Sequence, residues 1–406
     1  MAAPPPTEPS TYFRKGFGLQ SEVRDELAAD YDGRIVDLLR SQDYRLTVGD
    51  VTIRLAREFG FCYGVERAVD YAYQTRRKFP EKRIFLVGEI IHNPHVNDRL
   101  REMGVEILLR DADAGFDFSP IGAEDVVILP AFGVTIDDFA ALREIGCVLV
   151  DTTCGSVLNV WKRVESYARD GFTALIHGKY YHEETRATAS QVRKRGEGHY
   201  LIVRHMDEAR LVCDFIEGRI SAADLMRTFA RAVSPGFDPQ THLRRIGVAN
   251  QTTMLARESL AIAEEVGAAI ARARGEAARA TDFRSFDTIC SATQERQDAV
   301  RELLDEGVDV MVVIGGFNSS NTISLAALCA EKVPAYHIES SSGIDSEAGT
   351  IHYRPAGVQH SERDVEGWLP SGPIRIGITA GASTPNNKIG DVVARVLATR
   401  GLRAPV

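Results

Sequence analysis

The chain has 406 residues, of which 44% are apolar and 26% are charged, a balance typical of two or three globular domains that excludes disordered and fibrous proteins. The formal net charge is -9 and no block of Lys and Arg offers the basic stripe that binding to a phosphate backbone would require, so a nucleic-acid partner is not expected. The longest apolar stretches, such as residues 308–314, fall far short of the roughly 18 to 20 residues of a membrane span, so no membrane partner is expected.

The first 50 residues are predicted to form an N-terminal extension that packs on the main body. Residues 1–10 are rich in Pro and lack both the charged start and the apolar core of a secretory signal, which predicts a cytoplasmic location. Further along, apolar residues recur with a spacing that favours helices. These residues are Val23, Leu27, Ile35, Val36, Leu38 and Leu39.

From residue 51 onward, short apolar runs alternate with amphipathic stretches, which predicts α/β units built around parallel sheets. The runs are residues 84–87, 126–129, 148–150, 174–176, 310–314 and 374–378. Most of them end in polar loops, such as GEIIHN, HGKYYHEET, GGFNSSNT and TAGASTP. Because α/β proteins bind ligands at the carboxyl ends of parallel strands, these loops are candidates for a binding site, although any one of them could be an ordinary turn.

Three cysteines each stand just before a stretch with the apolar spacing of an amphipathic helix: Cys62, Cys154 and Cys290. They divide the chain into thirds, which predicts three related α/β modules that meet at a centre. The expected limits are 1–50 for the extension and 51–153, 154–289 and 290–400 for the modules, with an insertion near 204–245.

The six cysteines include no close pair and no C-x-x-C, so they match neither a disulfide framework nor a zinc finger. Cys147, Cys213 and Cys329 lie in apolar contexts and are expected to be small buried hydrophobes.

The other three cysteines are candidate metal ligands. A cysteine at a helix N-terminus meets unpaired backbone N–H groups and the positive end of the helix dipole, and both favour the thiolate. Three converging thiolates would form an incomplete set of soft ligands, for an iron–sulfur cluster with one iron lacking a cysteine or for a zinc ion with an open position. The alternative is that these three cysteines are also buried hydrophobes.

A candidate acid–base group follows the apolar run at 174–176. His182 and Glu184 are two residues apart, and a partly desolvated Glu184 could keep a raised pKa and deliver a proton to a leaving oxygen. The alternative is a solvated charged turn, and His92 has the same ambiguity.

The segment from Gly315 to Thr322 is a candidate anion site. Its glycines allow close approach of a ligand, and its hydroxyl, amide and helix N–H groups are neutral donors for phosphate oxygens. It lacks the GKS or GKT ending of a P-loop, so a small diphosphate fits it better than a nucleoside triphosphate. Ser383 could bind the same anion. Helix capping is the alternative for both segments.

Taken together, the segments GFCYGVERAV, EIIHNPHVN, DTTCGSV, HGKYYHEET, ANQTTM, DTICSATQERQ, GGFNSSNT and TAGASTP resemble the LytB/IspH family of 4-hydroxy-3-methylbut-2-enyl diphosphate reductases. They stand in the family's order over almost the whole chain. The length and the HGKYYHEET wording resemble the longer plant and cyanobacterial branch. The resemblance implies three α/β modules with small parallel sheets around a central iron–sulfur cluster, plus the N-terminal extension.

The resemblance also implies the parts of the reaction. One [4Fe-4S] cluster per chain would be held by Cys62, Cys154 and Cys290, and Glu184 would be the proton donor. The substrate, a small allylic diphosphate, would be reduced to isopentenyl and dimethylallyl diphosphates, the last step of the non-mevalonate isoprenoid pathway. The electron donor would be a ferredoxin or a flavodoxin. The substrate-binding groups would be His92, His182, Thr252, Ser319, Ser320, Asn321 and Ser383.

One residue departs from the pattern of the shorter bacterial members. Where they have a histidine in A-H-G-V, this chain has Phe132, and a phenyl ring cannot donate a hydrogen bond to phosphate. The longer branch also carries Phe there. Lys179 or Tyr180 is expected to replace the lost contact.

Two other classes of protein remain open at the level of sequence. A non-catalytic redox or oxygen sensor could use the same cluster, but it gives no reason for the anion loops. A zinc hydrolase could hold a metal ion and a water on the same three cysteines.

Overall fold

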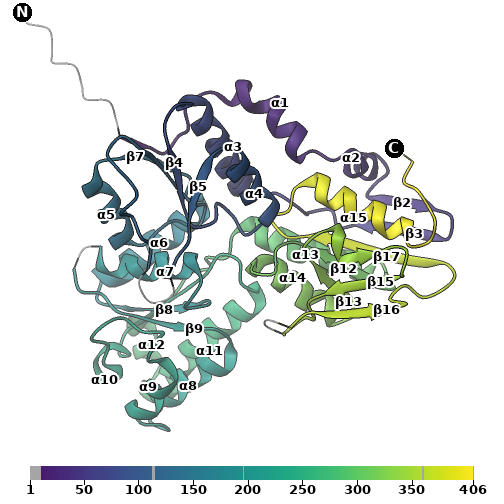
Figure 1. The fold of residues 1–406 in the computed structure, drawn as a ribbon. Coiled ribbons are helices and arrows are strands. Elements are labelled where there is room, and N and C mark those ends of the chain that lie inside the picture. Colours follow the sequence, from purple (N-terminus) through teal and green to yellow (C-terminus); the bar gives the residue numbers. More distant parts are fainter. Residues whose placement is uncertain (1–10, 112–114, 195, 359–360, 406) are drawn as a thin grey trace, which may run out of the picture.

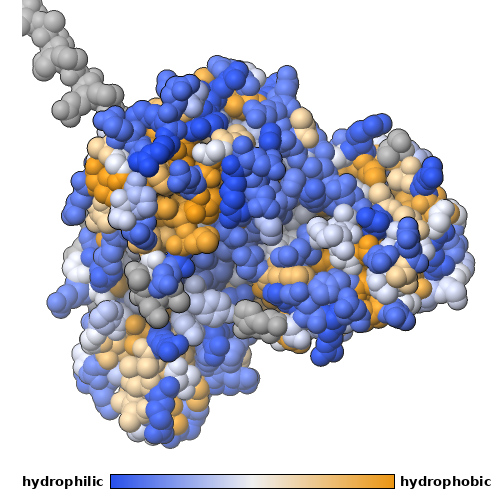
Figure 2. All heavy atoms as spheres, viewed as in Figure 1, coloured by the Kyte–Doolittle hydropathy of each residue, from blue (hydrophilic) through white to orange (hydrophobic). Residues whose placement is uncertain are grey.

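The computed structural model describes residues 11–111, 115–194, 196–358 and 361–405. Residues 1–10, for which the sequence predicts no secretory signal, lie outside the described residues. The chain forms three lobes that meet near the middle of the view in Figure 1. Hydrophilic residues cover most of the visible face, with an apolar area over the part of the first lobe that carries β4 and β5 (Figure 2).

The first lobe contains a five-stranded sheet in which all neighbouring strands are parallel. In spatial order its strands are β1 (Tyr12–Phe13), β7 (Val148–Asp151), β6 (Val126–Leu129), β4 (Ile84–Val87) and β5 (Val105–Leu108). Its helices are α3 (Tyr63–Lys78), α4 (Pro94–Glu102) and α5 (Ile136–Ile145). All residues of β4 and β6 are buried, as expected for central strands of a parallel sheet.

The second lobe has a four-stranded parallel sheet and more of the described helices than either of the other lobes. The strands are β11 (Phe283–Ser285), β10 (Ile246–Asn250), β8 (Thr173–His177) and β9 (Tyr200–Val203). The helices are α6 (Gly155–Arg169), α7 (Glu183–Ser190), α8 (Met206–Ile216), α9 (Ala222–Phe229), α10 (Pro239–His242), α11 (Ala256–Arg274) and α12 (Glu276–Asp282), with a 3-10 turn at Gln191–Arg193. The stretch expected to be an insertion carries α8, α9 and α10.

The third lobe has a five-stranded sheet, parallel except for its last pair, and a small antiparallel sheet that the sequence patterns did not predict. The large sheet is β13 (Ala335–Ile338), β12 (Val310–Ile314), β17 (Ile374–Ala380), β3 (Val51–Leu55) and β2 (Arg45–Val48). The small one is β14 (Ile344–Asp345), β15 (Thr350–Tyr353) and β16 (Arg363–Glu366), after a 3-10 turn at Ser341–Gly343. The helices are α13 (Ser291–Asp305), α14 (Ser320–Ala330) and α15 (Asn386–Ala398).

The α/β class and the parallel sheets are confirmed, because all six apolar runs lie in strands of these sheets. The extension forms α1 (Gln20–Tyr31), which packs on α3, and α2 (Arg34–Ser41), which packs on α15. None of the described helices is long and apolar enough to cross a bilayer.

The chain changes lobe at each of the three candidate cysteines. Cys62 follows β3 of the third sheet and begins α3, whose apolar face packs on the first sheet. Cys154 follows β7 of the first sheet and begins α6, which packs on the second sheet. Cys290 follows β11 of the second sheet and begins α13, which packs on the third sheet. The cysteines therefore mark the three crossovers of a closed cycle.

This cycle differs from the sequence-based division at the start of the first module. The pairing of β3 with β17 puts residues 51–55 in the third sheet, although they were expected in the first module. A short strand carries no signal that identifies the sheet it joins. The other predicted limits of the modules stay a prediction.

Candidate active site

The three crossover cysteines line one cavity. Each is held by a hydrogen bond from its backbone N–H to the loop that follows the neighbouring strand of the sheet the chain is leaving. The acceptors are the carbonyl of Ala382 for Cys62 (3.2 Å), that of Ala131 for Cys154 (2.9 Å) and that of Thr252 for Cys290 (3.4 Å). The predicted convergence of these cysteines is therefore present. The other three, Cys147, Cys213 and Cys329, are buried in apolar clusters, as expected.

The helix ends alone do not ionise these thiols. Burial raises the pKa of the Cys62 thiol, and it raises the pKa of the Cys290 thiol to about 11. Hydrogen bonding from the backbone at Val65 and from Thr293 opposes these shifts but is outweighed. The backbone N–H groups at the helix ends favour the thiolate, as expected, but burial has the larger effect on the pKa of both residues. A bound cation would be needed to deprotonate them.

Arg296 of α13 is a residue that the sequence patterns missed. Its side chain is buried, and its guanidinium donates to the carbonyls of Gly60 (2.7 Å) and Phe61 (3.2 Å) in the turn before Cys62. A helix begun by one cysteine therefore supports the loop that carries another. The arginine also favours the thiolate of Cys62 electrostatically.

Glu184 is fully enclosed at the start of α7, with 1% of its surface exposed, which excludes the solvated turn considered above. Its two carboxyl oxygens accept hydrogen bonds from the backbone N–H of Thr252 (2.6 Å) and from the Thr252 hydroxyl (3.0 Å). Burial raises the pKa of Glu184 to about 7, and the bonds from Thr252 limit the shift. A carboxyl with such a pKa can hold and release a proton near neutral pH.

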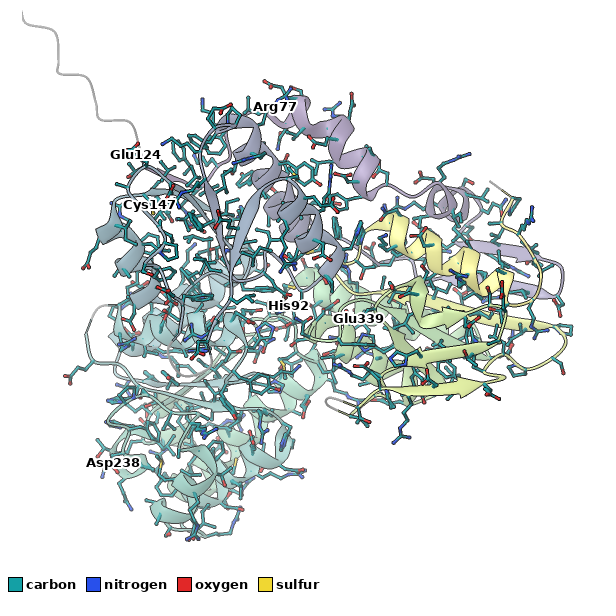
Figure 3. The ribbon with its side chains drawn as sticks, in the orientation of Figure 1. Arg77, His92, Glu124, Cys147, Asp238 and Glu339 are labelled. Atoms are coloured by element: carbon teal, nitrogen blue, oxygen red, sulfur yellow. The ribbon has the colours of Figure 1, made fainter. Side chains whose placement is uncertain are left out.

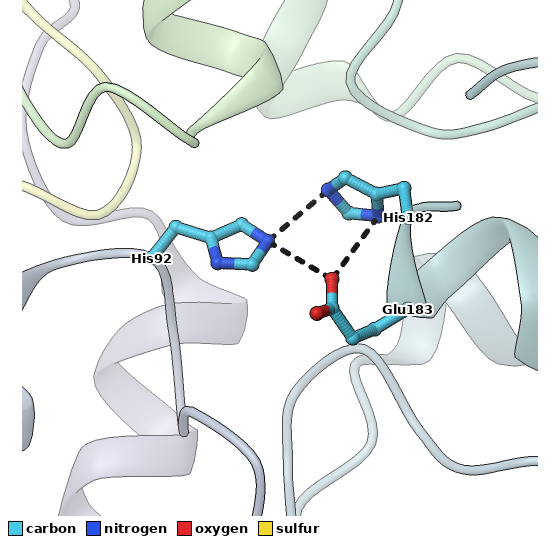
Figure 4. Close-up of side chains that lie close together, drawn as sticks. All are labelled: His92, His182 and Glu183. Carbon is cyan, nitrogen blue, oxygen red and sulfur yellow. Dashed lines mark hydrogen bonds and ion pairs between the residues drawn. The ribbon is translucent and has the colours of Figure 1, made fainter. Parts of the chain in front are cut away.

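His92 and His182, which line the same cavity as Glu184, face each other (Figure 4). The backbone N–H of Glu184 donates to His182 Nδ1 (3.2 Å), so the hydrogen of this neutral ring is assigned to Nε2. His182 Nε2 then donates to His92 Nε2 (3.1 Å), and His92 Nδ1 donates to Glu89 Oε2 (2.8 Å). Burial lowers the pKa of His182 well below its usual value, in agreement with a neutral ring.

Glu183 joins the two histidines, and the sequence analysis gave it no role. Its Oε2 lies 3.5 Å from His92 Nε2, and ligand atoms of all three side chains lie within 4.8 Å of one another (Figure 4). A metal ion on His182 would need a nitrogen lone pair, but Nδ1 accepts from Glu184 and Nε2 carries the hydrogen. We therefore interpret the histidine pair as hydrogen-bonding groups.

The glycine-rich segment supplies unpaired donors to the same cavity. Ser319 does cap α14, since its side chain accepts from Thr322 N. The Ser320 hydroxyl and the Asn321 Nδ2 group, however, are buried without a hydrogen-bond partner among the described residues. Buried donors of this kind normally find a partner, so their presence indicates a site for a ligand with acceptor oxygens. Helix capping explains only Ser319.

All residues singled out from the sequence as site residues line this one cavity. They are Cys62, Cys154, Cys290, Glu184, His92, His182, Thr252, Ser319, Ser320, Asn321 and Ser383. Figure 3 places His92 where the lobes meet. The individual roles expected for these residues stay a prediction.

Phe132 occupies the position of the missing histidine and stacks on the ring of His92, with ring centres 4.3 Å apart. Of the two substitutes expected, Tyr180 packs against the core of the second lobe. Lys179 lines a separate hollow that opens on His92 and His182. Its ammonium group has no hydrogen-bond or ion-pair partner among the described residues, and burial lowers its pKa. The geometry therefore favours Lys179.

Three lobes that deliver three thiols, a buried carboxyl and unpaired donors to one cavity define a class of enzyme with a metal-binding centre and a small anionic substrate. The sequence pattern of the LytB protein family matches residues 53–397. The chain belongs to the LytB family.

Similar proteins carry a consistent name. The chain is 46% identical over 404 residues to the 4-hydroxy-3-methylbut-2-enyl diphosphate reductase of Acaryochloris marina, covering 97% of this chain and 95% of that one. It is 47% identical over 392 residues to the protein of that name from Thermosynechococcus vestitus, covering 96% and 95%. Both relatives are cyanobacterial, in agreement with the expected branch.

Two solved structures are also similar. One, described as (E)-4-hydroxy-3-methyl-but-2-enyl diphosphate reductase, the terminal enzyme of the non-mevalonate pathway, has a TM-score of 0.50 and 28% identity, and the match covers 85% of this chain and 98% of that one. The other is the E-1-hydroxy-2-methyl-but-2-enyl-4-diphosphate reductase of Plasmodium falciparum, with a TM-score of 0.62, 19% identity and coverage of 85% and 87%. This second likeness concerns the fold alone.

Proposed function

We propose that this protein reduces (E)-4-hydroxy-3-methylbut-2-enyl diphosphate to isopentenyl and dimethylallyl diphosphates. Two electrons and two protons enter, the C–O bond of the allylic hydroxyl breaks, and the oxygen leaves as water. The observation that carries the proposal is that Glu184, whose pKa burial raises to about 7, lies in one cavity with three thiols and two unpaired donors. The name of the chain's relatives, 4-hydroxy-3-methylbut-2-enyl diphosphate reductase, supports the same reaction.

The thiols of Cys62, Cys154 and Cys290 fit a [4Fe-4S] cluster, because the cavity offers three sulfur ligands and its lining includes no fourth cysteine. When bound, such a cluster supplies electrons one at a time. Its positive ions would also supply the deprotonation that the helix ends do not.

The side chains of this chain would do the rest of the chemistry. Glu184 holds a proton at its carboxyl, and Thr252 fixes the orientation of that carboxyl through two hydrogen bonds. Ser320 and Asn321 are free to donate to diphosphate oxygens at the N-terminus of α14, where the helix dipole also favours an anion. The Nε2–H group of His182, which donates to His92 in this structure, could donate to the diphosphate instead.

Lys179 provides a test of how the diphosphate is held. A hydrogen bond to a charged group contributes about 1.5 to 3 kcal/mol, so we expect Lys179→Gln to raise KM by about 10- to 100-fold with little change in kcat. Steady-state kinetics with a reduced dye would measure both constants. Lys194→Gln is the control, since Lys194 pairs with Glu165 on the surface. An unchanged KM in the Lys179 variant would exclude it as the substitute.

Gly64 tests the cluster ligands. A Cβ added there would lie 2.6 Å from the sulfur of Cys154 and 3.9 Å from that of Cys62. We expect Gly64→Ala to displace the Cys154 thiol and lower the iron and sulfide bound after anaerobic reconstitution, since overpacking typically costs about 1 to 3 kcal/mol. Gly155→Ala is the matched control, because nothing lies within 4 Å of its added Cβ. Equal iron content in both variants would contradict the assignment.

The proposal as a whole is tested by anaerobic turnover of the allylic diphosphate, followed as oxidation of a reduced viologen dye by protein with an intact cluster spectrum. Formation of both five-carbon diphosphates is the expected result. An intact cluster without turnover or diphosphate binding would favour the sensor. A colourless protein that contains one zinc ion and no sulfide would favour the hydrolase.

A further inference from the structure

A surface groove runs beside Cys290. It has a volume of about 620 Å³ and lies between α6 and residues 287–291. Cys290 and Ser156 line both this groove and the central cavity, so only a thin wall separates the two. We call it the α6 groove.

The α6 groove is distinct from the hollow that opens on the histidines. The two have no lining residue in common. The histidine hollow is lined by the acidic residues Glu183, Glu339 and Glu362 as well as by Lys179 and Arg354. A substrate could therefore occupy the histidine side of the centre while the cysteine side stays accessible to a second partner.

The cysteine side of the centre lies close to solvent. The residue after each crossover cysteine is exposed: Gly155, Ser291 and, with 79% of its surface accessible, Tyr63. In the part of the chain that the structure describes, these three helix ends are therefore open to solvent at the residue after each cysteine. A protein that docks here would contact residues that are adjacent in sequence to the three cysteines.

The charges of the α6 groove favour an acidic partner. Lys162 and Arg163 are exposed and have no carboxylate partner among the described residues, and the Arg163 guanidinium lies 4.1 Å from the centre of the Phe286 ring. Asp287 is the one acidic residue in its lining. Two cations against one carboxylate make this a locally positive surface on a chain whose net charge is -9. Local charge of this kind steers an oppositely charged protein to one face.

We propose that the α6 groove is the docking site of an acidic one-electron carrier protein of the ferredoxin type, which delivers electrons beside Cys290. This inference rests on the proposed function. In each encounter the reduced carrier gives up one electron and leaves in its oxidised form. Two encounters, together with two protons, balance the removal of the substrate hydroxyl as water.

The experiment compares binding of an oxidised plant-type [2Fe-2S] ferredoxin to the cluster-loaded protein and to its Lys162→Glu/Arg163→Glu variant by titration calorimetry. The control variant, Lys78→Glu/Arg231→Glu, makes the same change in net charge at two exposed residues that have no ion pair among the described residues. Lys78 lies at the far end of α3, about 24 Å from Cys62 at 1.5 Å per residue. Dye-driven turnover of each protein is measured in parallel.

We expect the dissociation constant of ferredoxin to rise by about tenfold or more in the groove variant at low salt, with a weaker salt dependence and unchanged dye-driven turnover. The control variant should bind ferredoxin as the unchanged protein does. Equal affinity of the groove variant, or an equal loss in the control, would overturn the docking site. Dye-driven turnover without any ferredoxin binding would overturn the choice of partner while leaving the proposed function intact.

Discussion

Glu184→Gln is expected to lower kcat by about 10²- to 10⁴-fold, the usual contribution of a positioned general acid. The glutamine has nearly the same shape and can still accept from Thr252 through its carbonyl oxygen, but its amide group is not acidic and cannot transfer a proton to the substrate. The cluster spectrum should therefore be unchanged. Turnover with a reduced dye, compared at equal iron content, measures the effect.

The neighbouring glutamate is the matched control. Glu183 begins the same helix, but its side chain is 43% exposed and lies beside the histidines. We expect Glu183→Gln to keep most of the turnover. If the two variants lose equal activity, or if Glu184→Gln loses none, Glu184 is not the proton donor.

The raised pKa of Glu184 also predicts a dependence on pH. The carboxyl must be protonated to act as an acid, and burial raises its pKa to about 7. The activity that depends on this proton should therefore be complete well below pH 7 and fall as the pH rises through that value. The dependence of kcat/KM on pH reports the pKa of groups in the free enzyme. The fall in kcat/KM near pH 7 should therefore be absent from the Glu184→Gln variant.

Cys154→Ser is expected to lose the cluster and, with it, almost all turnover. Substitution of a residue that only orients a metal ligand typically lowers metal affinity or activity by about 10- to 100-fold. Loss of a ligand itself should therefore have a larger effect. Cys154 stands at a crossover and lines the cavity with Cys62 and Cys290, so no other described cysteine can take its place there. Iron and sulfide analysis and the visible spectrum after anaerobic reconstitution measure the loss.

Cys147→Ser controls for the general effect of removing a thiol. Cys147 is buried among apolar residues of the first lobe and is not part of the cavity lining. That variant should retain the spectrum of the cluster, even if its stability falls. A Cys154 variant with full iron content and turnover would show that the cluster ligands have been wrongly assigned.

The strands and the crossover cysteines could be predicted because their signals are local. A short apolar run such as 310–314 is buried on both faces wherever it pairs, and a cysteine just before an amphipathic stretch begins a helix in any arrangement of lobes. The burial of Glu184 was expected only as one of two alternatives. It depends on Thr252 and other residues distant in sequence that close over it.

The features that could not be predicted from the sequence depend on contacts between residues that are distant in the chain. Arg296 resembles any charged residue of an amphipathic helix until the turn before Cys62 is placed against it. Glu183 resembles a solvated neighbour of Glu184. The favourable effect of a helix end on a thiolate is visible in the sequence, whereas the opposing desolvation is a property of the packed cavity.

The cycle of crossovers links the stabilities of the three lobes. A ligand that binds only the folded chain adds stability in proportion to the logarithm of its concentration over its dissociation constant. Here the gain is available only when all three crossovers are in place, since each contributes one cysteine. With the cluster of the proposed function, its insertion would be a late step of assembly for the whole chain, and its oxidative loss would leave three lobes that are held together only by their own contacts.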